Sequence, residues 1–226
     1  MTTTYETSSQ VEPLYRAART VDRWGLVAGV TGFLANVLLA ILFMTPADGS
    51  YAWTGPANDS IGVVALLAII PVVAGLLTVC GDRPGLGAIT ALAIVTLAAM
   101  AAVELVFVLG LVPFPAEVDS SYAGLIVVFG WLLAVSRSGR TSGRLPRHVA
   151  GSGVALGAAG LAGAVLLAAS VATPDHSLAH AITFGAGALV SGPAYAAFPV
   201  GLIVLSGRLP GHLASGLRQP GALERG

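Results

Sequence analysis

The chain has 226 residues, of which 55% are hydrophobic and only 10% are charged, whereas a soluble domain carries about 25% charged residues. Eleven basic residues balance eleven acidic ones, and the zero net charge gives no reason to expect a nucleic acid partner. The single cysteine, Cys80, excludes an internal disulfide and any metal site built from several cysteines. This composition is typical of a protein embedded in a lipid bilayer.

Residues 1–23 form a polar tail that ends in a short amphipathic segment. From Leu14 onward, an apolar stripe of Leu14, Ala18 and Val21 lies opposite arginines of the same segment. Such a pattern is typical of a helix lying on a membrane surface. We expect this interfacial helix to lead into the first membrane span at Trp24.

Six apolar runs follow the tail, and a seventh segment, 207–226, is polar again. About 20 apolar residues suffice for a helix to cross the ~30 Å hydrocarbon core of a bilayer. None of the runs has the polar face that a helix of a soluble bundle needs. The sequence therefore predicts an all-α integral membrane protein, a bundle of six transmembrane helices. The predicted spans are 24–44, 61–80, 87–112, 122–136, 149–172 and 181–206.

The fourth span, 122–136, is shorter than the others. Its 15 residues would reach only about 22 Å as a helix. It must therefore extend through Ser120 and Ser121 or thin the bilayer, unless it is a re-entrant segment.

The arginines predict the orientation. All eleven lie before the first span, between spans two and three, between spans four and five, or after span six. The loops 45–60, 113–121 and 173–180 contain acidic residues and histidines but no arginine. The positive-inside rule then places both termini in the cytoplasm. Abundant Ala and Gly with no lysine suggest a GC-rich bacterial genome, so we expect a multi-pass protein of a bacterial plasma (inner) membrane.

Glu104 is the one charged residue inside the six runs. A carboxyl group is costly at membrane depth, so it should face protein or water and should be neutral unless a cation lies nearby. Asn36 in span one and Ser191 in span six lie at a similar distance from the outer ends of their spans. We expect Glu104 to form a hydrogen bond with Asn36 or with polar residues of span six.

Span six carries a polar stripe. Thr173, Pro174 and Asp175 resemble a helix start, and a helix beginning there would align several polar or small residues on one face. The opposite face, with Ile182 and Leu189, is suited to lipid. The predicted polar cavity therefore consists of Glu104, Asn36, His176, His180, Thr183, Ser191 and Tyr195.

No cofactor or metal site is predicted. His176 and His180 have the spacing of two ligands on one helix, and Asp175 could add a carboxylate, but the sequence supplies no convincing further ligand. Motifs of zinc proteases, serine hydrolases and phosphate-binding loops are absent, so catalytic residues remain unassigned.

A nine-residue segment, 142–150, recurs as 206–214 with seven identities. Each copy follows a span that runs toward the arginine-bearing side. A favoured sequence for leaving the membrane explains the repeat more simply than duplication of a hairpin: Gly ends the helix, Arg meets lipid phosphate and Pro prevents further helix.

Three functions are open at this point. The first is a small-solute or proton-linked permease with a polar cavity around Glu104, in which Pro193 and its neighbours bend span six. The second is an accessory or regulatory membrane protein, in which Glu104 and Asn36 only join helices. The third is a membrane-embedded enzyme acting on a lipid or isoprenoid, with Glu104 as general acid. The partners expected are the lipid bilayer and a solute or proton.

Overall fold

The computed structural model describes residues 8–44, 53–81, 83, 85–174 and 177–218. These described residues are helical apart from short connections, and they include no strand. All six helices are long and apolar enough to cross a membrane, as the sequence predicted. They are α1 (Ser8–Met44), α2 (Thr54–Cys80), α3 (Leu86–Val108), α4 (Phe114–Thr141), α5 (Arg147–Val171) and α6 (Leu178–Arg218).

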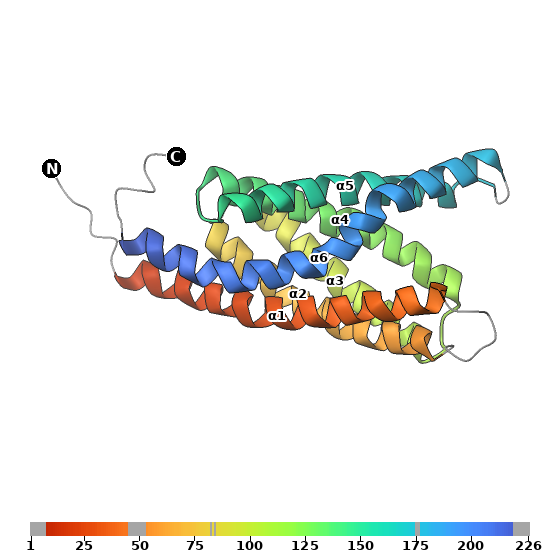
Figure 1. The fold of residues 1–226 in the computed structure, drawn as a ribbon, viewed down its shortest axis with the longest axis horizontal. Helices are drawn as coiled ribbons and strands as arrows, with labels where there is room; N and C mark the ends of the chain where they lie inside the picture. Colours follow the sequence, from red (N-terminus) through yellow and green to blue (C-terminus); the bar gives the residue numbers. More distant parts are fainter. Residues whose placement is uncertain (1–7, 45–52, 82, 84, 175–176, 219–226) are drawn as a thin grey trace.

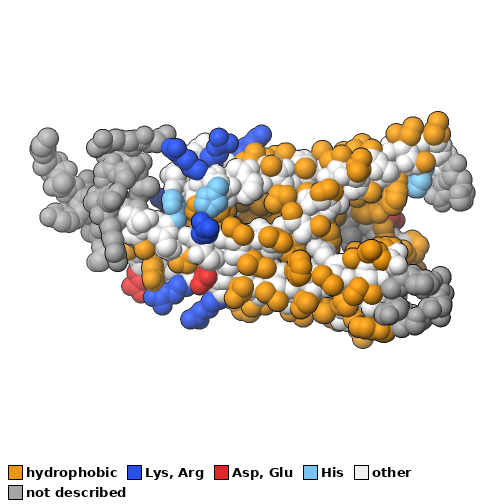
Figure 2. Space-filling view, viewed as in Figure 1, with side chains coloured by type: hydrophobic (Ala, Val, Ile, Leu, Met, Phe, Trp, Pro, Cys, Tyr) orange, Lys and Arg blue, Asp and Glu red, His pale blue; other side chains and the backbone are white. Residues whose placement is uncertain are grey.

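The helices form a ring of antiparallel neighbours (Figure 1). Each helix packs on the next one in the chain, α6 returns to pack on α1, and α2 also touches α4. Figure 2 shows the arginines of the visible face gathered at one end, which we call the arginine end. The opposite end, where α1, α3 and α5 finish, is the distal end. Toward the arginine end, a mostly apolar pocket of about 50 Å³ lies among the helices, lined by Trp131, Phe198 and Leu202 among others.

Glycines allow neighbouring helices to approach closely. A Cβ built on Gly157 of α5 would lie 2.7 Å from the backbone nitrogen of Leu133 in α4. A Cβ on Gly163 of α5 would lie 2.8 Å from the Cα of Ser191 in α6. Small residues in such positions are the usual means by which helices associate in a membrane. The glycine-rich face of α5 is therefore the contact surface for both of its neighbours.

Gly157→Ala is expected to destabilise the fold by about 1–3 kcal/mol, because the methyl group meets backbone atoms that cannot move aside. Gly151 lies on the same helix and has nothing within 4 Å of a built Cβ. Gly151→Ala is the matched control and should leave stability unchanged or raise it by about 0.5–1 kcal/mol. Thermal unfolding of both variants in detergent measures the difference, and equal midpoints would contradict the packing described.

Helix α6 changes partner along its length. Near the distal end, its Gly187 lies against Leu167 of α5. From its middle toward the arginine end, it packs on α1: a Cβ on Gly29 would lie 2.7 Å from the carbonyl oxygen of Pro199, and one on Gly25 would lie 3.3 Å from Ser206. Pro193 and Pro199 lie where the helix crosses from one partner to the other, and Figure 1 shows α6 running diagonally across the bundle. Proline removes a backbone hydrogen bond and bends a helix, so the crossing has a local cause.

Several helix boundaries differ from the sequence prediction, and three of the differences change how the elements are interpreted. Helix α1 runs without a break from Ser8 to Met44, so the segment expected to lie separately on a membrane surface is the first part of this helix. Helix α4 has 28 residues, so the short fourth run is only the most apolar part of a full-length helix. Helix α6 begins at Leu178 rather than at Thr173, whose hydroxyl instead donates to the carbonyl of Ser170 at the end of α5.

Polar contacts tie the helix ends together at the arginine end. Arg144 Nη1 donates to the carbonyl of Val79 at 3.0 Å, which joins the turn after α4 to the end of α2. The two copies of the repeated segment also meet here, because His212 Nε2 lies 3.0 Å from the carbonyl oxygen of Gly143. The arginine end is therefore the closed end of the ring.

Candidate functional site: an acidic recess

Glu104 lies on the face of α3 that packs inside the bundle. The buried residues of α3 recur every three or four positions, as Leu86, Thr90, Ala93, Leu97 and Ala101. Glu104 is the next position on this stripe, one turn closer to the distal end. The carboxyl group therefore faces protein, as expected for a charged group at this depth.

The carboxyl of Glu104 lies directly against α2, at Gly62. A Cβ built on Gly62 would collide with Oε1 of Glu104 and would lie 3.0 Å from its Cδ. A side chain at this position would displace the carboxyl of Glu104 from its present place. The sequence prediction placed Glu104 near spans one and six and did not identify this contact with span two.

Two further carboxyls, which the sequence analysis did not select, lie near Glu104. Asp59 of α2 comes three residues before Gly62, and Glu117 of α4 lies four positions before Ser121 on the buried face of that helix. Asp59, Glu104 and Glu117 interact electrostatically with one another. Each residue continues the buried stripe of its own helix toward the distal end. Both residues could have been found in the sequence by continuing the helical spacing of the apolar residues of α2 and α4 for one further turn.

Local hydrogen bonds orient two of these carboxyls. Ser121 Oγ donates to Glu117 Oε1 at 2.9 Å, and Asn58 Nδ2 donates to Asp59 Oδ1 at 2.8 Å. Helix α2 begins at Thr54. Asn58 and Asp59 therefore lie within the second turn of α2.

Tyr195 of α6 completes the group. Its phenol interacts electrostatically with Asp59, Glu104 and Glu117 on three other helices, yet 47% of the residue is exposed. Tyr195 therefore lies near the three carboxyls, at a part of α6 that is not fully covered by its neighbours. Gly192, one turn earlier, has nothing within 4 Å of a built Cβ. Figure 2 shows the surface hollowed between the distal parts of α6 and α1. We call the space bounded by Asp59, Glu104, Glu117 and Tyr195 the acidic recess.

Asn36 lies at the level of the recess. One turn closer to the arginine end, a Cβ on Gly32 would lie 3.1 Å from Pro199 and 4.0 Å from Ala65. By this register, Asn36 is level with Tyr195 on α6. However, Asn36 Nδ2 is buried and has no hydrogen-bond partner among the described residues, so the expected bond between Asn36 and Glu104 is not formed.

Asn36→Leu is expected to stabilise the fold by about 1 kcal/mol. A buried donor without a partner costs about 1–3 kcal/mol, and an apolar side chain of similar size removes that cost. Thermal unfolding in detergent is the measurement. Asn58→Leu is the control: the Asn58 amide has a hydrogen-bond partner, so the loss of this bond should destabilise the fold. A lower midpoint for Asn36→Leu would mean that its amide joins helices.

The remaining predicted cavity residues lie elsewhere. Ser191 packs on Gly163 of α5, and its hydroxyl donates to the carbonyl of Gly187 at 2.8 Å. His180 lies 3.0 Å from the carbonyl of Ser170 and stacks on Phe184. Thr183 donates to the carbonyl of Ala179 in its own helix, and His176 lies outside the described residues. The polar stripe of α6 thus faces α5, while Tyr195, at its end, reaches the recess.

The recess groups acidic side chains without basic compensation. The sequence has no arginine or lysine in the distal halves of the six described helices. Among the described residues, no group of three or more acidic, histidine or cysteine side chains is close enough to hold a metal ion. An acidic group without nearby basic residues is suited to attracting a cation or exchanging a proton.

Comparison with protein families, with curated proteins and with solved structures gave no match for this chain.

Proposed function

We propose that the chain is a multi-pass membrane protein with both termini in the cytoplasm and the acidic recess toward the outer side. The support is six helices that are long and apolar enough to span a membrane. In addition, the sequence places every arginine in a segment on the same side of the predicted spans. Fusing a reporter that is active only outside the cytoplasm after residue 226 tests the orientation. The reporter should be inactive there and active when inserted within residues 45–52 of the sequence, and the reverse pattern would overturn the orientation.

Within this arrangement, we propose that the protein is a permease for a small cationic solute, linked to proton movement through Glu104. The observation that carries the proposal is the grouping of Asp59, Glu104, Glu117 and Tyr195 from four helices, near the hollow between the distal parts of α6 and α1. Carboxyls inside a transmembrane bundle commonly lie on ion or proton pathways. A recess of one charge sign also raises the local concentration of ions of the opposite sign.

Helix α6 supplies the moving part of this permease. Its distal half is held by α5 and its other half by α1, and Pro193 and Pro199 lie between them. A bend at these prolines lets the distal half swing toward α1 and cover Tyr195. Transport by alternating access needs such a rocking element beside a fixed site.

A second candidate function is favoured by the sideways opening of the recess. Because the hollow lies between two helices (Figure 2), a lipid-soluble substrate could reach Glu104 from the bilayer. Glu104 would then be the general acid of an enzyme acting on a lipid or isoprenoid. The accessory role, by contrast, needs no open recess and no group of carboxyls.

Purified protein in liposomes that contain a pH-sensitive dye tests the permease. We expect a panel of small amines and quaternary ammonium ions to include at least one that drives a change of internal pH, and small anions to have no effect. Incubation of the same liposomes with lipid extracts, followed by mass spectrometry, tests the enzyme. Product formation without any cation-dependent pH change would replace the first candidate with the second.

A further inference from the structure

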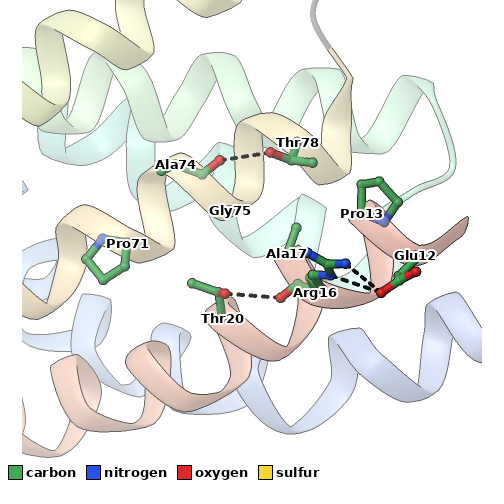
Figure 3. A pocket seen from close by; sticks show the side chains of 9 residues that line it. All are labelled: Glu12, Pro13, Arg16, Ala17, Thr20, Pro71, Ala74, Gly75 and Thr78. Carbon is green, nitrogen blue, oxygen red and sulfur yellow. Dashed lines mark hydrogen bonds and ion pairs between the residues drawn. The ribbon is translucent and has the colours of Figure 1, made fainter. Parts of the chain in front are cut away.

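A second open space lies at the other end of the molecule, between α1 and α2 (Figure 3). This groove has a volume of about 530 Å³ and is separate from the acidic recess. Its floor is made of small or cyclic side chains, including Ala17 of α1 and Pro71, Ala74 and Gly75 of α2. The volume is within the range of binding sites for small molecules, about 300–1,000 Å³.

The shape of the groove follows from close approach of the two helices beside it. A Cβ built on Gly75 would lie 2.8 Å from Val21 Cγ2 and 3.2 Å from the carbonyl oxygen of Ala17. The helices therefore touch at Gly75, and no large side chain fills the adjoining space along Ala74 and Pro71 (Figure 3). The result is an apolar channel that is open at the surface of the bundle.

One end of the channel is dipolar. Arg16 Nη2 donates to Glu12 Oε1 at 2.6 Å, and both side chains are well exposed, at 76% and 67%. An exposed pair of this kind is only weakly stabilising, so it can exchange partners readily. The hydroxyls of Thr20 and Thr78, which also line the groove, donate to carbonyls of their own helices. The groove thus offers one positive and one negative group beside an apolar floor.

We propose that this groove binds one molecule of a zwitterionic aminophospholipid. The lipid phosphate accepts a hydrogen bond from Arg16, and the primary ammonium donates one to Glu12. The part of an acyl chain nearest the head group lies along Ala74 and Pro71. The inference rests on the proposed membrane placement, which puts the arginine end at the level of the lipid head groups, and not on the permease activity. The lipid site would be unaffected if the acidic recess transported no solute.

Charge complementarity separates this occupant from other lipids. An anionic lipid without an ammonium group would satisfy Arg16 but would leave Glu12 facing a phosphate. A choline head group carries a positive charge but no N–H donor, so it cannot form the charge-assisted hydrogen bond to Glu12. Only a lipid with both a phosphate and a primary amine satisfies both side chains.

Native mass spectrometry of the full chain in detergent tests the proposal. Phosphatidylethanolamine, phosphatidylcholine and phosphatidylglycerol with the same acyl chains are the probes. We expect one phosphatidylethanolamine to bind about tenfold more tightly than either other lipid. Arg16→Ala and Glu12→Gln should each remove that preference. The matched control is Arg19→Ala, since Arg19 lies over the ring of Tyr15 and does not line the groove.

Two outcomes would overturn the proposal. Equal retention of the three lipids in the wild-type protein would show a general lipid contact only. Tighter binding of phosphatidylglycerol, increased by Glu12→Gln, would show a site for anionic lipid instead. In either case, the pH assay in liposomes still decides the proposed transport separately, because Glu12 and Arg16 lie at the opposite end of the bundle from the recess.

Discussion

Glu104→Gln is expected to reduce cation-linked proton movement in liposomes by about 100-fold or more, because glutamine cannot take up or release a proton. The amide has nearly the same size as the carboxyl, so it still fits against Gly62. The free energy of unfolding should therefore change by less than about 1 kcal/mol. Activity and thermal unfolding measured on the same preparation separate the two effects.

The matched control for Glu104→Gln is Asp119→Asn. Asp119 lies on α4 near the same end of the molecule, but it is exposed rather than turned toward the recess. Its neutralisation should leave activity within about twofold of wild type, since an exposed charge is screened by water and salt. If Glu104→Gln is as active as wild type, or if it fails to fold, Glu104 has a structural role.

Cross-linking α1 to α6 beside the recess should abolish transport reversibly. Where α1 and α6 pack together, a Cβ on Gly25 would lie 3.3 Å from Ser206, and one on Gly32 would lie 3.1 Å from Pro199. Continuing this register pairs Ala40 with Gly192 at the opening. A disulfide requires Cα atoms about 4.4–6.8 Å apart, so the double variant Ala40→Cys, Gly192→Cys can close only when α6 swings toward α1.

We expect oxidation of this double cysteine variant to lower uptake by more than about tenfold and reduction to restore it. Each single cysteine variant is a control that should be insensitive to oxidation. The native Cys80 is only 2% exposed and should not interfere. Full activity of the cross-linked protein would mean that the opening between α1 and α6 does not close during transport.

The sequence was sufficient to predict six helices of spanning length, because a continuous apolar run identifies such a helix without reference to its neighbours. It also identified Glu104, the one charged side chain inside the apolar runs. Asp59 and Glu117 were missed because both lie just outside those runs, where an acidic residue resembles a loop or a helix cap. Only the helical stripe that each continues, visible once the buried faces are known, connects them with Glu104.

The direction of the polar stripe on α6 could not be predicted, because it depends on which helix lies beside it. Ser191 was expected near Glu104 at the same depth, but Gly163 allows α5 to approach and occupy that face. The repeated segment gives a second example. Gly143 has a φ of +66° and ends α4, whereas Gly207 at the equivalent position continues α6. Identical local sequence thus adopts two conformations, selected by tertiary packing.

The electrostatic character of the recess can be measured without knowing the solute. In Tyr195→Cys, the thiol would lie among Asp59, Glu104 and Glu117, and membrane-impermeant thiol reagents of similar size but opposite charge can be applied from outside. We expect the cationic reagent to react at least about tenfold faster than the anionic one, and the ratio to fall when Glu104→Gln is added. Leu189→Cys, on the exposed face of α6, is the control that should show no such preference. Equal rates for the two reagents at Tyr195→Cys, or no reaction from the outer side, would contradict an open acidic recess.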